Sequence, residues 1–186
     1  RARRIKSLLA QREAWTVEDC LHLQRDLVSA EAIAVLKQLR PDLEQHSGPV
    51  ARELMAWDAT MDAASNAALL YSQFMLELGD AIGGDEANRV SLARTPLDRE
   101  EILRLLAGGL DESWWDDVSV EGRQTRTDVI KTLLDRLDGA PAPGKWGDVH
   151  TVLFAHPLTW IPRAGSLLVG TWNRGPFPIG GDGSTL

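Results

Sequence analysis

The residue types most suited to chemistry gather in the stretch "GGDGST" at positions 180–185. Glycines followed by hydroxyl side chains are typical of loops whose backbone N–H groups cradle a phosphate. Such a loop also needs a lysine before the Ser or Thr, to reach the β and γ phosphates, and a helix after it. The stretch has no lysine and no helical pattern after it, so a glycine turn is favoured over a phosphate site.

The histidines do not have the spacing of a metal site. A continuous strand would place His150 and His156 on one face but ~20 Å apart, too far to bind one ion. The sequence contains no H-x-x-x-H and no C-x-x-C pair, which argues against a zinc site. We expect His22 and His46 to be surface or hydrogen-bonded side chains rather than catalytic groups.

Other candidate reactive groups have structural explanations. The carboxylate pairs Asp116–Asp117 and Asp58 with Asp62 are better explained by a solvated loop or a helix cap. No G-x-S-x-G nucleophile elbow is present. The single cysteine, Cys20, excludes an internal disulfide, and its helical apolar pattern predicts an inert buried thiol. By spacing alone, the sequence contains no complete active site.

The first 140 residues have the periodicity of helices. "TVED" at 16–19 indicates a capping box, with Thr16 as the N-cap and Asp19 reaching back. We expect this helix to run through "AIAVLKQL" and to end before Pro41. The other predicted boundaries are helix starts at Pro49 and at Thr95 with Pro96 and Asp98, and helix ends at Gly79, Gly108 and Gly139.

A change of pattern follows "APAPG" at 140–144. The stretches "WGDVHTVLFAHPL" and "GSLLVGTW" read as strands bounded by glycine and proline. The sequence therefore predicts a helical segment over 1–144 and a β-strand and glycine-rich turn segment over 145–186. A segment with two or three short strands cannot bury a core alone, so it must pack on the helices or on other chain.

Composition narrows the class of protein. The chain has 186 residues, 44% hydrophobic and 25% charged, with a formal net charge of −7. The acidic balance argues against a nucleic-acid partner, which requires phosphate neutralisation. No stretch approaches the ~18 apolar residues that a membrane span needs. Seven tryptophans spread along the chain suggest several packing layers or a large interface.

Three stretches in the same order resemble one family. "RARRIKSLLAQREAWTVEDCLHLQRDLVSAEA" is similar to a segment of penicillin acylases that reads Arg-x-x-x-Ile, leucines, Thr-x-Glu-Asp and Gln-x-Asp. "WGDVHTVLFAHPL" resembles their W-G-x-x-H-x-x-x-x-x-H-P-L stretch. "RGPFPIGGDGSTL" resembles the G-G-D-G-x-T segment that follows it. The family also includes cephalosporin and acyl-homoserine-lactone acylases.

The resemblance implies an N-terminal-nucleophile hydrolase with an αββα sandwich core. In this family the precursor cuts itself, which exposes a serine at the start of the large subunit. The serine hydroxyl attacks an amide with its own α-amine as base. A backbone N–H and an asparagine side chain form the oxyanion hole.

The same resemblance implies that this chain is an internal fragment of the large (β) subunit. It starts with Arg1 rather than with a nucleophile, and it stops within the glycine-rich segment. The nucleophile, the oxyanion asparagine and the small (α) subunit are therefore expected outside the chain. One functional residue matches the family pattern: the arginine that opens the R-x-x-x-I helix near the active site corresponds to Arg1, whereas Arg3 and Arg4 do not match it.

We therefore expect a mostly α protein with a C-terminal β segment, forming part of an α+β αββα hydrolase. The whole enzyme would hydrolyse linear N-acyl amides, small-molecule substrates, and the fragment alone would be inactive. Its expected partners are the rest of the large subunit and the small subunit. No cofactor is expected in this chain; structural calcium in the full enzyme would have its ligands elsewhere. Family members are usually exported, so a periplasmic or extracellular location is expected. The alternative is a stand-alone helical protein-interaction module without catalysis.

Overall fold

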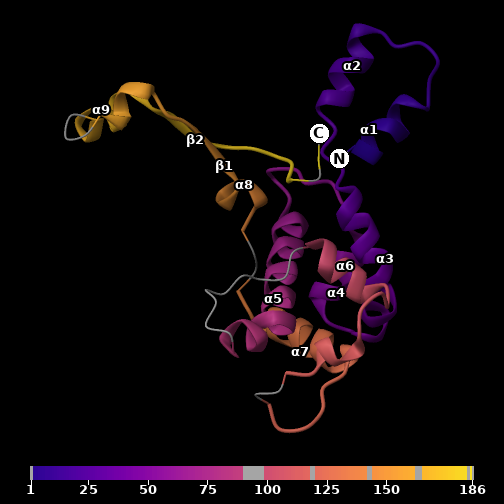
Figure 1. Ribbon diagram of the computed structural model, residues 1–186. Helices are drawn as coiled ribbons and strands as arrows, with labels where there is room; N and C mark the ends of the chain where they lie inside the picture. The colour runs from indigo at the N-terminus through magenta and orange to yellow at the C-terminus, as the bar shows by residue number, and fades with distance from the viewer. Residues whose placement is uncertain are drawn as a thin grey trace. The chain divides into compact units, whose positions relative to one another are not determined.

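The computed structural model describes residues 2–89, 99–117, 120–141, 144–161, 165–183 and 185 (Figure 1). The chain divides into two compact units, each assembled from separate stretches. The helical unit comprises Ala30–Ala59 and Leu69–Pro143. The motif unit comprises Arg1–Ser29, Thr60–Ala68 and Gly144–Leu186. The predicted division into a helical segment over 1–144 and a β-strand segment of the hydrolase sandwich over 145–186 remains a prediction.

The prediction of a mostly helical chain with a small C-terminal sheet is confirmed. The helical unit contains α3 (Ala30–Gln45), α4 (Pro49–Ala56), most of α5 (Asn66–Arg89), α6 (Arg99–Leu106), the short 3-10 helix η1 (Glu112–Trp115) and α7 (Arg126–Asp138). Helix α3 packs against α4, α6 and α7 (Figure 1). The core is formed by fully buried side chains of all five α-helices: Leu39, Leu43, Leu54, Tyr71, Phe74, Leu78, Ile82, Ile102, Leu106, Ile130 and Leu134.

The motif unit contains α1 (Ala2–Leu9), α2 (Val17–Gln24), the short helix α8 (Trp146–Val149), β1 (Thr151–Phe154), η2 (Pro157–Trp160), α9 (Gly165–Trp172) and β2 (Arg174–Pro178). Strands β1 and β2 pair antiparallel, with Thr151 opposite Pro178 and Val152 opposite Phe177. The register shifts by one residue before Phe154. No described helix in either unit has the length and apolar character needed to cross a membrane.

The single helix predicted from residue 17 to residue 40 is wrong, because α2 and α3 are separate helices. The segment between them forms hydrogen bonds with a distant stretch of the motif unit instead. Val28 forms an isolated antiparallel bridge with Thr60, and Met61 N–H donates to the Leu27 carbonyl at 2.9 Å. Backbone groups that are satisfied in this way cannot also continue a helix.

The predicted helix end before Pro41 is also wrong, because α3 includes this residue and continues to Gln45. A proline removes one intrahelical hydrogen bond. The following turn buries Leu43, which is only 1% exposed, and that burial offsets the loss.

The other helix boundaries give a mixed result. Helix α4 begins at Pro49, α6 is followed by Gly108 with φ +73°, and α7 is capped by Gly139, as predicted. Helix α5 continues past Gly79, contrary to prediction, because Leu78 and Ile82 are buried on either side of it. The predicted start signals Thr95, Pro96 and Asp98 lie outside the described residues.

Two parts of the predicted β-rich tail are helical. "WGDV" forms α8, and "GSLLVGTW", predicted as a strand, forms α9. A short apolar run has no periodicity that separates strand from helix, so its surroundings decide. Helix α9 packs against η2, and the Trp172 ring lies edge-on to His156 with centroids 4.7 Å apart.

Cys20 is exposed, which corrects the prediction of a buried thiol. Helix α2 buries none of its residues, so its apolar positions do not enter the core. A bidentate ion pair joins α1 to the segment after α2: Arg4 Nε donates to Asp26 Oδ2 at 2.7 Å and Arg4 Nη2 to Asp26 Oδ1 at 3.0 Å. The hydrogen bond with Asp26 raises the pKa of Arg4.

The predicted capping box at the start of α2 is present. Thr16 Oγ1 accepts from Asp19 N–H at 3.1 Å, and Asp19 Oδ2 accepts from Thr16 N–H at 3.1 Å. Hydrogen bonds from Thr16 lower the pKa of Asp19 from 3.8 to about 2. A carboxyl group with a lowered folded-state pKa stabilises the fold above pH 3.8, and this contribution is lost as pH falls through about 2.

We therefore expect Thr16→Ala to lower the local opening free energy of α2 by about 1 kcal/mol at neutral pH. The difference from wild type should shrink as pH falls from 4 towards 2, roughly the interval in which Asp19 titrates. Amide exchange of residues 20–24 measures it. Val17→Ala is the matched control, because Val17 is 79% exposed and takes part in no cap. Equal exchange in both variants would show that the cap does not limit the opening of α2.

Candidate functional site

The two motifs that resemble the acylases at the C-terminal end are in direct contact. Trp146, from "WGDVH", is 8% exposed and donates its indole N–H to the carbonyl of Gly181, from "GGDGST", at 2.9 Å. The backbone continues the contact, because Gly181 N–H donates to the Met61 carbonyl at 2.7 Å. Trp146 N–H donates to the Ser65 carbonyl at 3.0 Å. We call this meeting point of residues 61–65, 146–150, 179–183 and 185 the motif junction.

Two glycines of the motif junction, Gly147 and Gly180, lie so close to neighbouring segments that a Cβ atom would not fit. A Cβ at Gly147 would lie 2.8 Å from Pro178 Cβ and 3.0 Å from the Ala63 carbonyl oxygen. A Cβ at Gly180 would lie 2.7 Å from Leu27 Cδ1 and 2.9 Å from the Met61 carbonyl oxygen. Side chains at these positions would push the packed segments of the junction apart.

Gly181 is required for its backbone conformation as well. Its φ is +85°, a region that other residues adopt only with strain. A Cβ there would lie 2.6 Å from Thr185 Oγ1. The glycine at this position of the "GGDGST" motif is therefore needed for the backbone conformation and the packing of the turn.

The glycine-rich stretch around Asp182 folds into a hydrogen-bonded turn, the structure that the sequence favoured over a phosphate-binding loop. Asp182 N–H donates to Thr185 Oγ1 at 2.8 Å, and Thr185 N–H donates to Asp182 Oδ1 at 3.0 Å. The Thr185 hydroxyl donates to the Asp182 carbonyl at 3.0 Å. The N–H groups of Gly181, Asp182 and Thr185 therefore already have partners within the protein. Ser184 lies outside the described residues.

His150 extends the pairing of β1 and β2 and lies in the motif junction. Its ring stacks on Trp146 with centroids 4.7 Å apart and an interplanar angle of 18°. Its carbonyl accepts from Ile179 N–H at 3.1 Å, and its Nδ1 lies 3.1 Å from the Ile179 carbonyl oxygen. A proton on Nδ1 satisfies this contact and leaves Nε2 as the basic nitrogen.

The other histidines serve local structure. His156 does not continue β1: it is the N-cap of η2, where Nδ1 accepts from Leu158 N–H at 3.3 Å. His46 is hydrogen-bonded, as expected, with Nε2 2.7 Å from Asp138 Oδ2. His22 is exposed and lies 3.4 Å from Glu18.

One member of each carboxylate pair accepts a hydrogen bond from a backbone N–H group. Asp116 Oδ1 accepts from Gln124 N–H at 2.8 Å, and Asp62 Oδ1 accepts from Ala64 N–H at 2.7 Å. Within the described part of the chain, no group of three or more His, Cys, Asp or Glu side chains is arranged to hold a metal ion.

Arg1, the predicted supporting residue of catalysis, lies outside the described residues. Helix α1 begins at the next residue, Ala2, and carries Arg4, whose pairing with Asp26 anchors the helix. The structure thus describes the element that follows Arg1 and does not test its predicted role.

Comparison with known proteins decides what these motifs mean. The sequence model of the family described as penicillin amidase matches residues 1–186. The chain belongs to the penicillin amidase family. This match includes both motifs of the junction and the α1–α2 segment.

Named relatives of the family agree with this assignment. The chain is 28% identical over 204 residues to penicillin acylase 2 proenzyme of Pseudomonas sp. (strain SE83), covering 100% of this chain and 24% of that protein. It is 30% identical over 170 residues to acyl-homoserine lactone acylase QuiP of Pseudomonas syringae pv. syringae (strain B728a), covering 81% of this chain and 20% of that protein. It is 26% identical over 225 residues to acyl-homoserine lactone acylase QuiP of Pseudomonas aeruginosa, covering 100% of this chain and 27% of that protein. The chain therefore spans about a quarter of the length of these curated relatives.

Sequence reasoning missed Arg126, a side chain of α7 that bonds to both α3 and α6 of the helical unit. Arg126 Nη1 donates to the Leu106 carbonyl at 2.7 Å. Its Nη2 donates to the Gln38 carbonyl at 2.6 Å and to Asp42 Oδ2 at 2.8 Å. Only its place in the first turn of α7 could be read from the sequence, and that position gives no sign of these distant partners.

Proposed function

We propose that this chain is an internal part of the large subunit of an amide hydrolase that converts linear N-acyl amides to a carboxylic acid and an amine. The observation that carries the proposal is the penicillin amidase match along the whole chain, with its two C-terminal motifs packed together through Trp146 and Gly181. The names of the relatives support acylase chemistry on penicillins or acyl-homoserine lactones.

In the proposed enzyme the nucleophile is an N-terminal serine exposed by self-cleavage, located outside this chain. Its own α-amine would take the proton as the hydroxyl attacks the amide carbon. A backbone N–H and an asparagine side chain, also outside the chain, would stabilise the oxyanion. Apart from Arg1, the residues of this chain would serve as scaffold: the motif junction would hold β1, β2 and the glycine-rich turn in place for the αββα sandwich.

The decisive experiment compares the intact gene product with the 186-residue chain, using chromogenic phenylacetyl and long-chain acyl anilides. The intact, processed protein should release amine, and the chain alone should not. Turnover by the chain that survives repurification would contradict the proposal that the nucleophile lies elsewhere. An intact protein without turnover on any acyl length would favour the alternative, a stand-alone helical interaction module.

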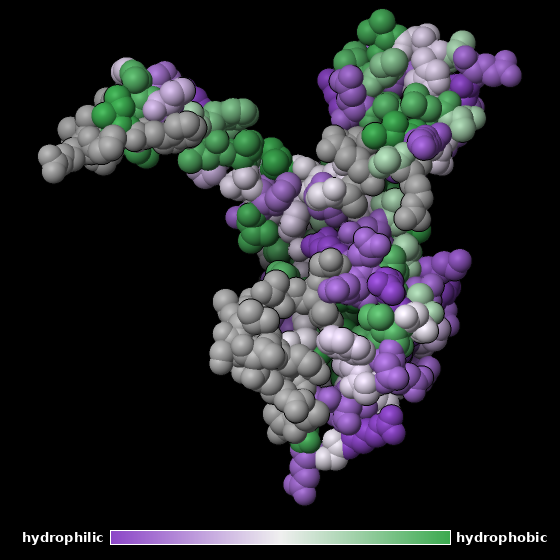
Figure 2. Space-filling model, in the orientation of Figure 1, coloured by the Kyte–Doolittle hydropathy of each residue, from purple (hydrophilic) through white to green (hydrophobic). Residues whose placement is uncertain are grey.

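The motif unit carries a large exposed apolar surface, which we call the apolar arm. Its members are 41–63% exposed: Val149, Leu153, Phe154, Leu158, Ile161, Val169, Trp172 and Phe177. Figure 2 shows hydrophobic surface along this part of the motif unit. A two-stranded sheet exposed on both faces is marginally stable by itself. We propose that the rest of the large subunit, or the small subunit, covers it.

Amide exchange tests this partner proposal. In the isolated chain, β1 and β2 should exchange faster than α3 because few buried contacts hold them. In the intact protein, their protection should rise to the level of α3. Equal protection of β1, β2 and α3 in a proven monomer of the isolated chain would rule out the need for a cover.

A supporting role for Arg1 is part of the same proposal. Its guanidinium fork would hold the oxyanion asparagine or a neighbouring carbonyl. Losing a direct oxyanion donor costs roughly 10² to 10³ in kcat. We expect Arg1→Ala in the processed enzyme to lower kcat roughly tenfold to a hundredfold, by analogy with residues that orient the ligands of a metal site.

Arg1→Lys keeps the charge without the fork, so it should recover only part of the rate. The melting temperature should stay near that of wild type in both variants and serves as the folding control. A wild-type kcat in Arg1→Ala would remove Arg1 from the proposed site.

The remaining expectations about the whole protein are proposals of the same kind. We propose an exported, periplasmic or extracellular enzyme, and structural calcium with ligands outside this chain. The fractionation of the intact protein and its metal content after dialysis test the two separately.

A further inference from the structure

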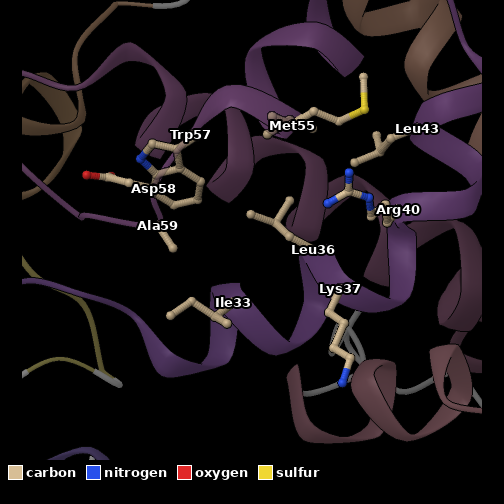
Figure 3. A pocket seen from close by; sticks show the side chains of 10 residues that line it. Ile33, Leu36, Lys37, Arg40, Leu43, Met55, Trp57, Asp58 and Ala59 are labelled. Carbon is tan, nitrogen blue, oxygen red and sulfur yellow. The ribbon is translucent and has the colours of Figure 1, made fainter.

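A hollow of about 290 Å³ lies in the helical unit between α3 and the C-terminal end of α4 (Figure 3). Most of its wall is apolar, and the hollow lies at the lower end of the size range of small-molecule sites. The apolar side chains of the wall are Ile33, Leu36, Leu43, Leu54, Met55, Trp57 and Ala59. Ile33 and Met55 are 48% and 42% exposed, so the hollow opens to solvent.

One cation points across this apolar surface. Figure 3 shows the Arg40 guanidinium extending between Met55 and Leu36. Its Nε donates to Glu44 at 2.7 Å, which fixes one edge of the guanidinium. The two Nη groups form the other edge, which has the geometry to bind a carboxylate through two hydrogen bonds.

The other charged residues of the hollow are compatible with an anion. Lys37 lies on the same helix, one turn before Arg40, and Figure 3 shows its side chain directed away from Arg40. Asp58 is the one acid in the lining, and Figure 3 shows its carboxylate directed away from Arg40. An anion with an apolar body therefore fits the wall and the Arg40 guanidinium, whereas an apolar cation would face Arg40.

The far wall is held in a defined shape. The Trp57 ring packs against the fully buried Tyr71 with centroids 5.2 Å apart at 41°. Ala59, 2% exposed, has φ +62°, a left-handed conformation that costs a residue with a Cβ about 1–2 kcal/mol. Strain of this kind concentrates at ligand sites, where the surrounding structure over-determines the backbone.

We propose that the hollow between α3 and α4 binds an organic carboxylate with a short aliphatic or aromatic body, with Arg40 on the carboxylate and Trp57 against the apolar body. The proposal does not rest on amide hydrolysis, because its test measures binding. The binding site can therefore be refuted while the proposed amide hydrolysis stands, and the proposed hydrolysis can be refuted while the binding site stands.

The test is an NMR titration of the isotope-labelled 186-residue chain with sodium octanoate. Shifts should saturate and be confined to the lining, including the Trp57 indole and the Ala59 amide. A dissociation constant of about 1 mM is expected for a ligand of this size. Octylammonium has the same apolar body with the opposite charge, and acetate has the carboxylate alone; both should bind at least tenfold more weakly.

Arg40→Gln should weaken octanoate about tenfold, the effect of losing a charge-assisted hydrogen bond that is partly screened by solvent. Arg52→Gln is the matched control, because it removes an exposed charge from α4 outside the lining and should change binding less than twofold. Equal binding of octylammonium, or an unchanged affinity in Arg40→Gln, would overturn the anion site.

The same titration with the intact protein separates a binding site from a packing surface. Octanoate shifts at Trp57 and Ala59 that persist there support the proposal. Shifts that vanish because another part of the enzyme fills the hollow overturn it, as does a concentration-dependent shift without ligand, which would indicate pairing of two copies.

Discussion

Replacing Arg126 with alanine is expected to destabilise the helical unit by about 3 kcal/mol. The variant loses hydrogen bonds to the Leu106 and Gln38 carbonyls and the ion pair with Asp42. Asp42 is only 9% exposed, so its carboxylate would be left largely desolvated without a cation. Breaking one side of such a pair costs more than the pair contributes, because the remaining charge has no partner.

The measurement is the opening free energy from amide exchange of α3 and α7, because a chain with two units need not unfold in one step. Arg136→Ala is the matched control on the same helix. Arg136 donates its Nε to Glu77 at 3.0 Å but is 60% exposed, so its loss should cost less than about 1 kcal/mol.

A second variant tests whether Asp42 is the reason for the loss. Adding Asp42→Asn to Arg126→Ala should restore part of the stability, since it removes the unpaired charge. Equal effects of Arg126→Ala and Arg136→Ala would show that the Arg126 cluster does not hold the unit together.

Gly181→Ala is expected to destabilise the motif junction by about 3 kcal/mol. A left-handed backbone costs alanine about 1–2 kcal/mol. The new methyl group would also lie 2.6 Å from Thr185 Oγ1. Thr185 is 3% exposed and its hydroxyl is tied into the turn with Asp182, so its displacement would break hydrogen bonds worth about 1 kcal/mol each.

Gly183→Ala is the matched control two residues away in the same motif. A Cβ at Gly183 meets no atom within 4 Å, and its backbone is outside the left-handed region. Its effect should stay within about 0.5 kcal/mol. The readout is the exchange rate of the Trp146 indole N–H, which donates to Gly181. Equal rates in both variants would show that the glycine at 181 is not a structural requirement.

Local signals in the sequence predicted those features that depend on a few neighbouring residues. The capping box of Thr16 and Asp19, the start of α4 at Pro49 and the end of α7 at Gly139 were all correct. Each of these boundaries is decided by side-chain and backbone groups within one helical turn. The acylase motifs were equally readable, and they predicted the family to which the chain belongs.

The tertiary structure decided the features that depend on distant partners. The Leu27 carbonyl and Val28 pair with residues 60 and 61, which ends the predicted long helix early. The apolar run 165–172 is a helix rather than a strand, and Cys20 is exposed because α2 buries nothing. The Arg126 cluster and the contact of Trp146 with Gly181 join residues 20 to 88 positions apart. No local pattern encodes such pairs, because their energy comes from satisfying backbone groups and charges that only folding brings together.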